Sequence, residues 1–306
     1  MKGIHELPED MILEILSTLN PKDIVKLCQT HPTINRICKE KKSYLVRLIL
    51  QKYKIDWEDP GNFIYIMNKT TPKKYLNKRS DGSKEWDFKG IYKLYYKYFD
   101  KKIIKCEDKG ITSMPIYPNM REFYGSYNNL TSFPIQPKMT DCEVFGNKLT
   151  SFPTQPNMVY FNGNENELDL FPVQPKMSQF DGKNNKLTYF PVQPNMEECD
   201  IDRNLLASFP IQPKMTSFSG KNNRLTSFLS QPEMKFFVGD NNLLTEFPVQ
   251  PKMTKFSGRN NRLTDFPVQP KMTYFYGSNN DFTSFPKQPK LIACNITPFV
   301  TENCNF

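Results

Sequence analysis

Apolar residues recur with a period of nineteen residues through the last two-thirds of the chain. A Leu or Ile, replaced once by Phe, occupies the same position of every repeat: Ile111, Leu130, Leu149, Leu168, Leu187, Leu206, Leu225, Leu244, Leu263 and Phe282. A Met stands ten residues ahead of each of these from Leu130 onward. A fixed period of about twenty residues predicts a solenoid, in which each repeat forms one coil and stacks on its neighbours. Because solenoids present extended surfaces rather than enclosed pockets, the pattern predicts a binding protein.

Aligned on the Leu, the repeat reads Met-x-x-Phe-x-Gly-x-x-Asn-x-Leu-x-x-Phe-Pro-x-Gln-Pro-x. Its first eleven positions resemble the leucine-rich-repeat pattern L-x-x-L-x-L-x-x-N-x-L. This resemblance implies one short parallel strand per coil, followed by an Asn that turns inward and bonds the backbone of neighbouring coils. We expect about eleven such strands, which would stack into a parallel sheet.

A Phe and a Gly two residues apart are coupled in the repeats. Cys142, Cys199 and Cys294 replace the Phe, and in the first two of these repeats Val144 and Ile201 replace the Gly. Since the Phe and the Gly are lost together, the two positions share one volume, and each Phe ring is predicted to lie over its Gly. The cysteines at these positions are interpreted as small buried hydrophobic residues rather than as catalytic thiols.

The second half of each repeat, Phe-Pro-x-Gln-Pro, places prolines three residues apart, as at Pro134 and Pro137. Proline fixes φ and has no N–H to donate, so this convex side is predicted to be extended and polyproline-like rather than helical. An extended return is narrower than a helix, which favours an open and gently curved solenoid. The repeats are similar to the short leucine-rich repeats of bacterial effectors, whose unit has a Leu-Pro-x-Leu-Pro return. Here the unit is one residue shorter and Gln replaces a Leu.

Strand positions that alternate with the buried ones are predicted to form a face that binds a target. Charged and aromatic side chains at these positions are the candidates: Tyr124, Glu143, Tyr160, Asp181, Glu198, Asp200, Asp202, Lys221, Phe236, Lys255, Arg259, Tyr274 and Tyr276. Such side chains suit protein recognition, and charges also keep an exposed sheet soluble. Residues 111–202 carry 6 basic and 11 acidic side chains, whereas residues 203–306 carry 12 and 6. This gradient predicts a partner of complementary polarity, with association that salt weakens.

Residues 4–50 have the apolar spacing of short helices. The spacing predicts one helix that ends near Leu19, a second that starts at Pro21, a third that starts at Pro32 and a fourth over 45–53. Proline in the first turn is typical of a helix start, because its missing N–H has no partner there. The amino-terminal region is therefore predicted to be a small helical bundle.

The string Leu-Pro-x-x-x-Ile-x-x-Ile-Leu-x-x-Leu-x-Pro-x-Asp-Ile-x-x-Leu, from Leu7 to Leu27, resembles the first half of the F-box motif. The second half of the family motif usually has a Trp after the Cys, whereas this chain has Thr-His-Pro at 30–32. The resemblance implies docking onto the Skp adaptor of cullin–RING ubiquitin ligases. The residues that would contact the adaptor are Leu7, Pro8, Ile12, Ile15, Leu16, Leu19, Pro21 and Ile24. The alternative is that several of them form the core of the bundle; Leu7 and Pro8, ahead of the first helix, are the favoured contacts.

We therefore predict an α+β protein, in which a small helical F-box-like bundle precedes a parallel-stranded leucine-rich-repeat solenoid. Its parts are an F-box-like domain at 1–50, a helical linker or cap at 51–100, the solenoid at 101–296 and a tail at 297–306. Within the second part, the tract 69–84 is predicted to be an exposed loop.

Charge and cysteine content exclude several classes of protein. The net charge of +9 is concentrated in residues 1–110, which carry 23 basic and 15 acidic side chains. A nucleic-acid-binding solenoid needs a continuous basic track, and the acidic half of the repeats disfavours it. No signal-like segment or membrane-spanning apolar stretch is recognised, so we expect a cytoplasmic or nuclear protein without a membrane partner. Seven unevenly spaced cysteines without a Cys-x-x-Cys pair argue against a disulfide framework and a zinc site, and no cofactor is expected.

The two modules together predict a substrate-recognition subunit of an SCF-type, cullin–RING ubiquitin ligase that holds an unidentified target near the conjugated ubiquitin. The combination resembles the F-box/leucine-rich-repeat proteins of giant viruses that infect amoebae, which implies a host ligase, a host target and the host cytoplasm. An enzyme is disfavoured, because His5 and His31 both lie in the amino-terminal module and Cys304 lies in the short tail. A scaffold or virulence protein that binds a partner without any ligase is the alternative.

Overall fold

The computed structural model describes residues 4–19, 21–29, 31–41, 76–78, 84–86 and 100–296. The chain divides into two compact units. The first comprises residues 1–102 and 111–120, and the second comprises residues 103–110 and 121–306.

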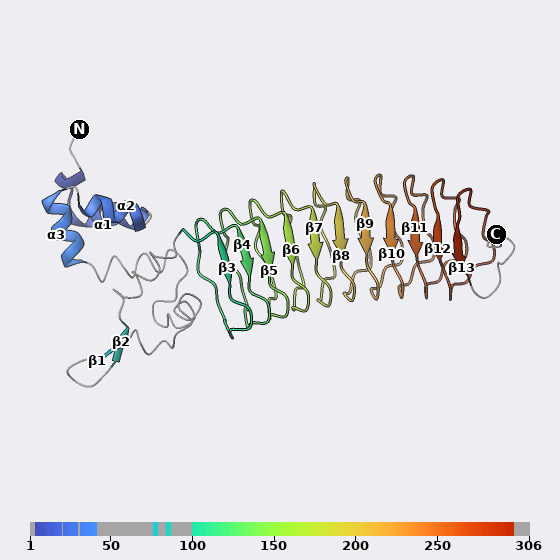
Figure 1. The fold of residues 1–306 in the computed structure, drawn as a ribbon, viewed down its shortest axis with the longest axis horizontal. Helices are drawn as coiled ribbons and strands as arrows, with labels where there is room; N and C mark the ends of the chain where they lie inside the picture. Colours follow the sequence, from blue (N-terminus) through green and yellow to red (C-terminus); the bar gives the residue numbers. More distant parts are fainter. Residues whose placement is uncertain are drawn as a thin grey trace. The chain divides into compact units, whose positions relative to one another are not determined.

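The first unit begins with a short 3-10 turn, η1 (Ile4–Glu6), and three helices, α1 (Glu9–Thr18), α2 (Pro21–Cys28) and α3 (Pro32–Glu40) (Figure 1). These confirm three of the four predicted helices, and the one predicted over 45–53 lies outside the described residues. Apolar side chains at helical spacing form the core of this bundle: Ile12, Leu16, Ile24, Ile34 and Ile37, each at most 5% exposed.

Cys28, the last residue of α2, forms a disulfide with Cys38 of α3. The sequence analysis argued against a disulfide framework and did not predict this bond. The two cysteines are ten residues apart, and they approach each other only once α2 and α3 pack together, so their spacing alone could not reveal the bond. Cys294, in the second unit, is also disulfide-bonded and only partly buried, so its interpretation as a small buried hydrophobic residue is wrong.

A small antiparallel sheet is described between the bundle and the repeats. Strand β1 (Leu76–Lys78) pairs with β2 (Lys84–Trp86). Strand β1 lies within the tract 69–84, which was predicted to be an exposed loop, so that prediction differs from the structure there. The two strands also lie within the linker predicted to be helical over 51–100, most of which is outside the described residues. The tail predicted at 297–306 lies outside the described residues.

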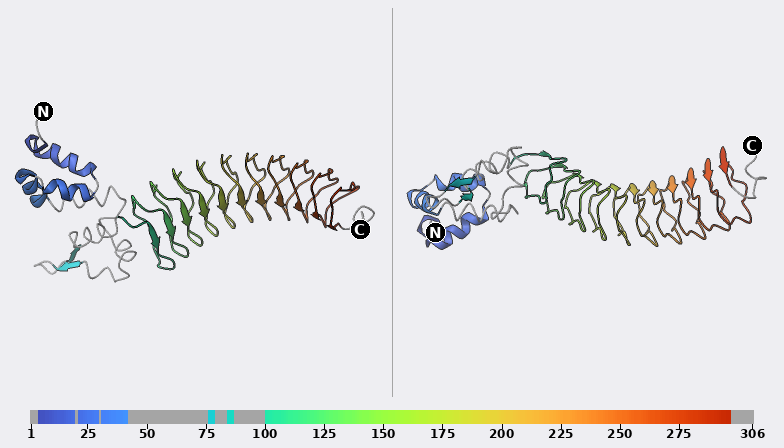
Figure 2. Two further views of the ribbon diagram at one scale, coloured as in Figure 1. Left: turned by 45° about the horizontal axis from the view of Figure 1, so that its top comes forward. Right: turned by 90° about the horizontal axis from the view of Figure 1, so that it is seen from below.

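The second unit is a solenoid with one parallel sheet of eleven strands, which lie side by side in chain order (Figures 1 and 2). The strands are β3 (Ile103–Lys105), β4 (Glu122–Tyr124), β5 (Asp141–Glu143), β6 (Tyr160–Asn162), β7 (Gln179–Asp181), β8 (Glu198–Asp200), β9 (Ser217–Ser219), β10 (Phe236–Val238), β11 (Lys255–Ser257), β12 (Tyr274–Tyr276) and β13 (Ala293–Asn295). Each residue pairs with the one a full repeat later, as Phe237 does with Phe256. The predicted number of strands and their parallel stacking are confirmed, and no helix occupies the return segments among the described coils.

Two columns of Phe side chains run through the solenoid core, one from the strands and one from the returns. Phe218 of β9 illustrates their packing, because its ring lies 4.5 Å from Phe209 and 4.9 Å from Phe228, centroid to centroid, on the returns before and after it. These rings meet at tilted angles, an arrangement that aromatic pairs favour. The Leu and Met positions of the repeat are fully buried beside them, as at Leu225 and Met215.

The predicted coupling of Phe and Gly is confirmed. A Cβ built on Gly220 would lie 2.5 Å from Cζ of Phe218, so the ring occupies the space that a side chain would need. In the repeat that carries Cys199, Ile201 fills this space and is fully buried. The two pairs thus fill one volume in two ways.

A ladder of buried Asn side chains joins each coil to the previous one. Asn147 accepts a hydrogen bond from the backbone N–H of Leu130 at 3.0 Å through Oδ1. Its Nδ2 donates to the carbonyl of Gly125 in the previous coil, at 3.0 Å, and to that of Val144 in its own coil, at 2.9 Å. The amide thereby satisfies backbone groups that have no strand partner, as the repeat pattern predicted.

A second ladder, of Gln side chains, does the same on the return side. Gln155 is fully buried. Its Oε1 accepts from the backbone N–H of Gln136 at 2.7 Å, and its Nε2 donates to the carbonyl of Pro134 at 3.1 Å. A polyproline-like segment makes no internal hydrogen bonds, so these amides supply the partners that the buried backbone requires. The sequence analysis assigned the Gln no role.

Candidate interaction surfaces

The outward side chains of the solenoid sheet form its strand face. We define it as the first and third residue of each strand from β4 to β12, together with the second residue after each strand. Along each strand the middle residue is buried while its neighbours are partly or fully exposed, as in Lys255–Ser257. Because the strands are in register, side chains at one position form columns across the sheet, about 4.8 Å apart.

Carboxylates dominate the strand face from β4 to β8. This acidic segment consists of Glu122, Asp141, Glu143, Asp181, Glu198 and Asp200. Burial, reinforced by the charges of Glu107 and Asp141, raises the pKa of Glu143 above its usual value. Burial and the nearby charge of Asp202 likewise raise the pKa of Asp200. The carboxylates therefore repel one another, and a positively charged partner would relieve that repulsion.

Two lysines neutralise part of this charge within the face. Lys183 lies 3.1 Å from Asp200 and 3.5 Å from Asp181, measured from Nζ to the carboxylate oxygens. Burial alone would lower the pKa of Lys183, but the hydrogen bond to Asp200 and the charges of the two carboxylates raise it. Lys221 lies 3.1 Å from Asp202.

Asp202 requires a correction to the predicted target-binding set. It is 7% exposed. Its Oδ1 accepts hydrogen bonds from the hydroxyl of Ser219 and the backbone N–H of Lys221, both at 2.7 Å. Asp202 therefore joins neighbouring coils instead of offering an exposed contact, because its short carboxylate accepts hydrogen bonds from Ser219 and Lys221 of the next coil.

The strand face from β10 to β12 is different in character. This cation–aromatic segment consists of Phe236, Lys255, Tyr274, Arg259 and Tyr276. The Lys255 ammonium lies between two rings, 5.6 Å from the centroid of Phe236 and 5.2 Å from that of Tyr274. The Arg259 guanidinium lies 4.9 Å from the centroid of Tyr276. Cations over aromatic faces at these distances are attracted by the ring quadrupole.

A hollow of about 260 Å³ lies on the strand face over β6 to β9, at the end of the acidic segment. Its lining includes Tyr160, Asp181, Asp200, Ser217 and Ser219, and it opens where β9 presents only small serine side chains. Oδ1 of Asp181 is buried there without a hydrogen bond, although the Lys183 ammonium lies 3.5 Å away.

Most predicted target-face residues do reach the strand face. Tyr124, Glu143, Tyr160, Asp181, Asp200, Lys221, Arg259, Tyr274 and Tyr276 are partly exposed, and Glu198, Phe236 and Lys255 are exposed. The prediction omitted Glu122, Asp141 and Lys183. Counting one repeat back from Tyr160 to Asp141, and another to Glu122, would have found the two acids.

The cysteines of the solenoid interior give no indication of a reactive thiol. Cys106, Cys142 and Cys199 are buried and not disulfide-bonded. Burial, with help from neighbouring acids, raises the pKa of Cys106 to about 12 and those of Cys142 and Cys199 well above the usual value. These thiols stay protonated at neutral pH, and a thiol is a poor nucleophile. Among the described residues no cluster of His, Cys, Asp or Glu is arranged to hold a metal ion.

The predicted adaptor-binding residues divide between the core and the surface of the bundle. Ile12, Leu16 and Ile24 are buried. These three therefore belong to the core of the bundle, which was the alternative to adaptor contact. Pro8 is exposed, and Leu7, Ile15 and Leu19 are partly exposed. The side chain of Pro21 lies outside the described ones. Adaptor binding by this set stays a prediction, and the exposed and partly exposed members offer surface for it.

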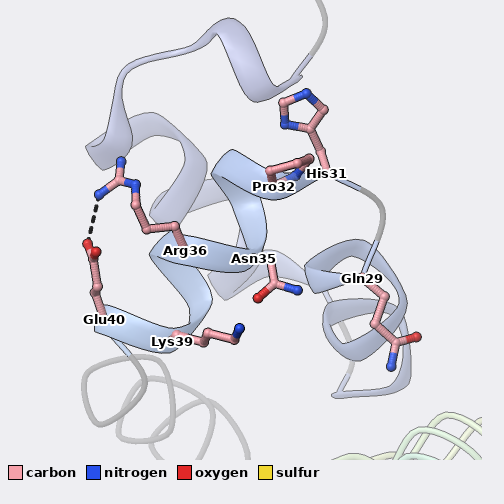
Figure 3. Close-up of a pocket in the computed structure, with 7 residues that line it drawn as sticks. All are labelled: Gln29, His31, Pro32, Asn35, Arg36, Lys39 and Glu40. Atoms are coloured by element: carbon pink, nitrogen blue, oxygen red, sulfur yellow. Dashed lines mark hydrogen bonds and ion pairs between the residues drawn. The ribbon is translucent and has the colours of Figure 1, made fainter.

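A broad hollow of about 710 Å³ lies against α3 (Figure 3). Its lining is polar and mostly exposed: Gln29, His31, Pro32, Asn35, Arg36, Lys39 and Glu40. Nδ1 of His31 caps α3 by accepting the backbone N–H of Thr33 at 3.2 Å, and the His31 ring stacks on His5 with centroids 4.0 Å apart. Arg36 pairs with Glu40 at 2.7 Å. This mixed, open surface suits a macromolecular contact better than an enclosed small ligand.

Comparisons with known proteins support both units. Residues 4–46 match the F-box domain, and no curated protein matches the chain. The solenoid is similar to YopM from Yersinia enterocolitica, at 21% identity and a TM-score of 0.58, over 61% of this chain and 44% of that one. It is also similar to YopM from Yersinia pestis, a leucine-rich effector protein, at 21% identity and a TM-score of 0.51, over 68% of this chain and 75% of that one.

These likenesses show the fold. The present chain spans less than half of the first YopM chain. Among the described residues no helix has the length and apolarity needed to cross a membrane. The chain therefore combines an amino-terminal F-box domain with a parallel-stranded, leucine-rich-repeat-like solenoid of nineteen-residue repeats.

Proposed function

We propose that the chain is the substrate-recognition subunit of a cullin–RING, SCF-type ubiquitin ligase. The observation that supports this most is the presence in one chain of an F-box domain at 4–46 and a solenoid with a chemically varied, exposed strand face. F-box domains generally bind Skp-type adaptors, and the strand face would hold the target protein.

The adaptor would contact the exposed apolar surface at the start of the bundle. Leu7 and Pro8 precede α1, and the partly exposed Ile15 and Leu19 lie on and just after that helix. Contacts of this kind bury apolar side chains, each worth about 1.5–3 kcal/mol when fully buried. The buried Ile12, Leu16 and Ile24 would support the shape of this surface from within.

In this proposal the chain performs no chemistry of its own. It raises the local concentration of a target lysine near the ubiquitin that the ligase carries, and proximity supplies the acceleration. The buried, protonated thiols of the repeats are consistent with a non-catalytic role. The expected compartment is the cytoplasm or nucleus. If the chain comes from a giant virus, the ligase and the target would belong to its host.

Co-purification tests the adaptor half of the proposal. The full chain is expressed with a Skp adaptor and a cullin, and retention of the adaptor is compared between the wild type and Leu7→Ala/Pro8→Ala. The matched control is Ile135→Ala/Pro137→Ala, which removes an exposed aliphatic side chain and an exposed proline from a return segment. Retention by the wild type and the control, with loss in the first variant, is expected. Absence of adaptor from the wild-type eluate would overturn the ligase assignment.

The second candidate is a scaffold or host-interaction protein that binds its partner without a ligase. One observation favours it: the Trp usual in the second half of the F-box motif is absent, and His31 and Pro32 stand there at the start of α3, beside a polar hollow. The same experiment separates the candidates, because the scaffold would bind its target and leave the adaptor behind.

A further inference from the structure

We propose that the cation–aromatic segment of the strand face is the docking site for a short acidic stretch of the target polypeptide, about three Asp or Glu residues long. This inference rests on the proposed target-binding role of the strand face and specifies its chemistry. The segment comprises Phe236, Lys255, Tyr274, Arg259 and Tyr276, as described above.

Lys255 and Arg259 hold charges that this part of the molecule leaves unmatched. Lys183 and Lys221 each have a carboxylate partner within 4 Å, whereas among the described residues Lys255 and Arg259 have none. Asp240, nearby, already accepts from the hydroxyl of Ser257 and from the backbone N–H of Arg259. The aromatic rings attract the two cations, but they do not accept conventional hydrogen bonds from the N–H groups as a carboxylate oxygen would.

A carboxylate supplies what the segment lacks. Charge-assisted hydrogen bonds from ammonium and guanidinium groups to carboxylates are roughly twice as strong as neutral ones, and a guanidinium can hold a carboxylate through two parallel bonds. Phe236 is 40% exposed beside Lys255, so an apolar contact is available next to the charge. An aromatic and cationic cluster of this type has the composition of a protein-recognition hot spot.

The sheet geometry sets the length of the acidic stretch. The segment covers three neighbouring strands, β10 to β12, which span about 10 Å at ~4.8 Å per strand. An extended peptide advances about 3.3 Å per residue, so about three residues cover the segment.

The rest of the strand face determines the class of partner. After the neutral serines of β9, the acidic segment begins at Glu198 and Asp200 of β8. A long polyanion that followed the face would meet these carboxylates and be repelled, which disfavours nucleic acid and anionic membranes. A folded or extended polypeptide avoids the repulsion by placing neutral or basic residues there. Charge complementarity along the face thus favours a protein with a short acidic stretch followed by a basic one.

Fluorescence anisotropy of the full chain with labelled peptides at low ionic strength tests the inference. The probes are Glu-Glu-Glu in a Gly/Ser peptide, the same peptide with Lys-Lys-Lys placed about six residues further on, and an all-Glu peptide of equal length. We expect the acidic–basic peptide to bind about tenfold tighter than the first probe, and the all-Glu peptide to gain nothing over it. Tighter binding by the all-Glu peptide, or by a single-stranded RNA of similar length, would overturn the proposal.

Charge reversal locates the site. The variant Lys255→Glu/Arg259→Glu is expected to bind the Glu-Glu-Glu peptide about tenfold or more weakly than the wild type does, and to bind a Lys-Lys-Lys peptide instead. The control, Lys271→Glu/Lys290→Glu, makes the same change of net charge at two exposed lysines outside the strand face and should alter binding less than about twofold. Equal losses in both variants would contradict the inference, because they would reflect net charge alone.

Adaptor co-purification with the same two variants separates this inference from the ligase proposal. Absence of the adaptor from the wild-type eluate, with wild-type peptide binding intact, overturns the ligase assignment only. Unchanged peptide binding by Lys255→Glu/Arg259→Glu overturns the docking site only. Both substitutions are on outward side chains, and unchanged circular dichroism spectra would establish that the variants are folded.

Discussion

The Phe218 ring occupies the space that a side chain at Gly220 would need, since a Cβ there would lie 2.5 Å from its Cζ. Replacing Gly220 alone by Ile should therefore destabilise the solenoid by about 1–3 kcal/mol through overpacking, and Phe218→Cys alone should cost about 3 kcal/mol or more through a cavity. The double variant copies the natural Cys199 and Ile201 pair. We expect it to be at least about 2 kcal/mol more stable than the sum of the single effects, measured by urea denaturation. Additive effects would show that the two positions do not share a volume.

Removal of one rung of the Gln ladder should be costly. Gln212→Leu deprives the buried backbone N–H of Gln193 of its 2.7 Å acceptor, and an unsatisfied buried donor costs about 1–3 kcal/mol. Amide hydrogen exchange at Gln193 should accelerate in this variant. Gln179→Leu, an exposed strand-face position, is the control and should leave exchange at Gln193 unchanged. Protection of that amide in the Gln212 variant would contradict the assigned role of the ladder.

Reduction of the Cys28–Cys38 disulfide should destabilise the helical bundle. The bond closes a loop of about ten residues, for which chain entropy gives about 3 kcal/mol. Cys28→Ser/Cys38→Ser should lower the bundle's melting temperature as much as a reducing agent lowers that of the wild type. In the double-serine variant the reducing agent should not change the melting temperature of the bundle. A further decrease of the melting temperature in that variant would mean that another cysteine is responsible.

The acidic segment should make the solenoid slightly more stable as the pH falls from 7. Burial and the charges of Glu107 and Asp141 raise the folded-state pKa of Glu143 above its usual 4.5, so the native state holds the proton more tightly than the unfolded state. The cost of the charge is full above the folded pKa and disappears as the pH falls toward 4.5. Glu143→Gln should therefore raise the free energy of unfolding at pH 7, measured by urea denaturation, by up to about 0.5 kcal/mol, and have no effect below pH 4.5. Glu246→Gln, at an exposed position outside the strand face, provides the comparison; an equal gain there would contradict the local cause.

Much of the solenoid follows from its period. The joint replacement of Phe and Gly at 142/144 and 199/201 indicated that each Phe ring lies over its Gly, and the prolines indicated a return without helices. The Gln ladder could not be recognised in the same way, because Gln is usually exposed. Its role follows only from where the extended return leaves backbone groups without partners, as at Gln136 and Gln155.

The interaction surfaces were less predictable. Alternation along each strand placed Lys255 and Tyr274 on one face, but pairing across coils is a three-dimensional property that the alternation does not encode. Thus Asp202 was predicted to be exposed and is instead enclosed by Ser219 and Lys221. In the bundle, helical spacing could not distinguish residues of the core from residues that would contact an adaptor, and Ile12 and Leu16 are core residues.

Each coil of the solenoid is joined to the next by the same Asn and Gln bonds, whatever its strand face carries. A gene encoding such an array can gain or lose whole repeats by duplication or deletion without leaving a backbone group unsatisfied. Such an event would change the spacing between the acidic and cation–aromatic segments in steps of one strand. Because of the two ladders, the specificity of the strand face could change during evolution while the packing of the solenoid interior stays the same.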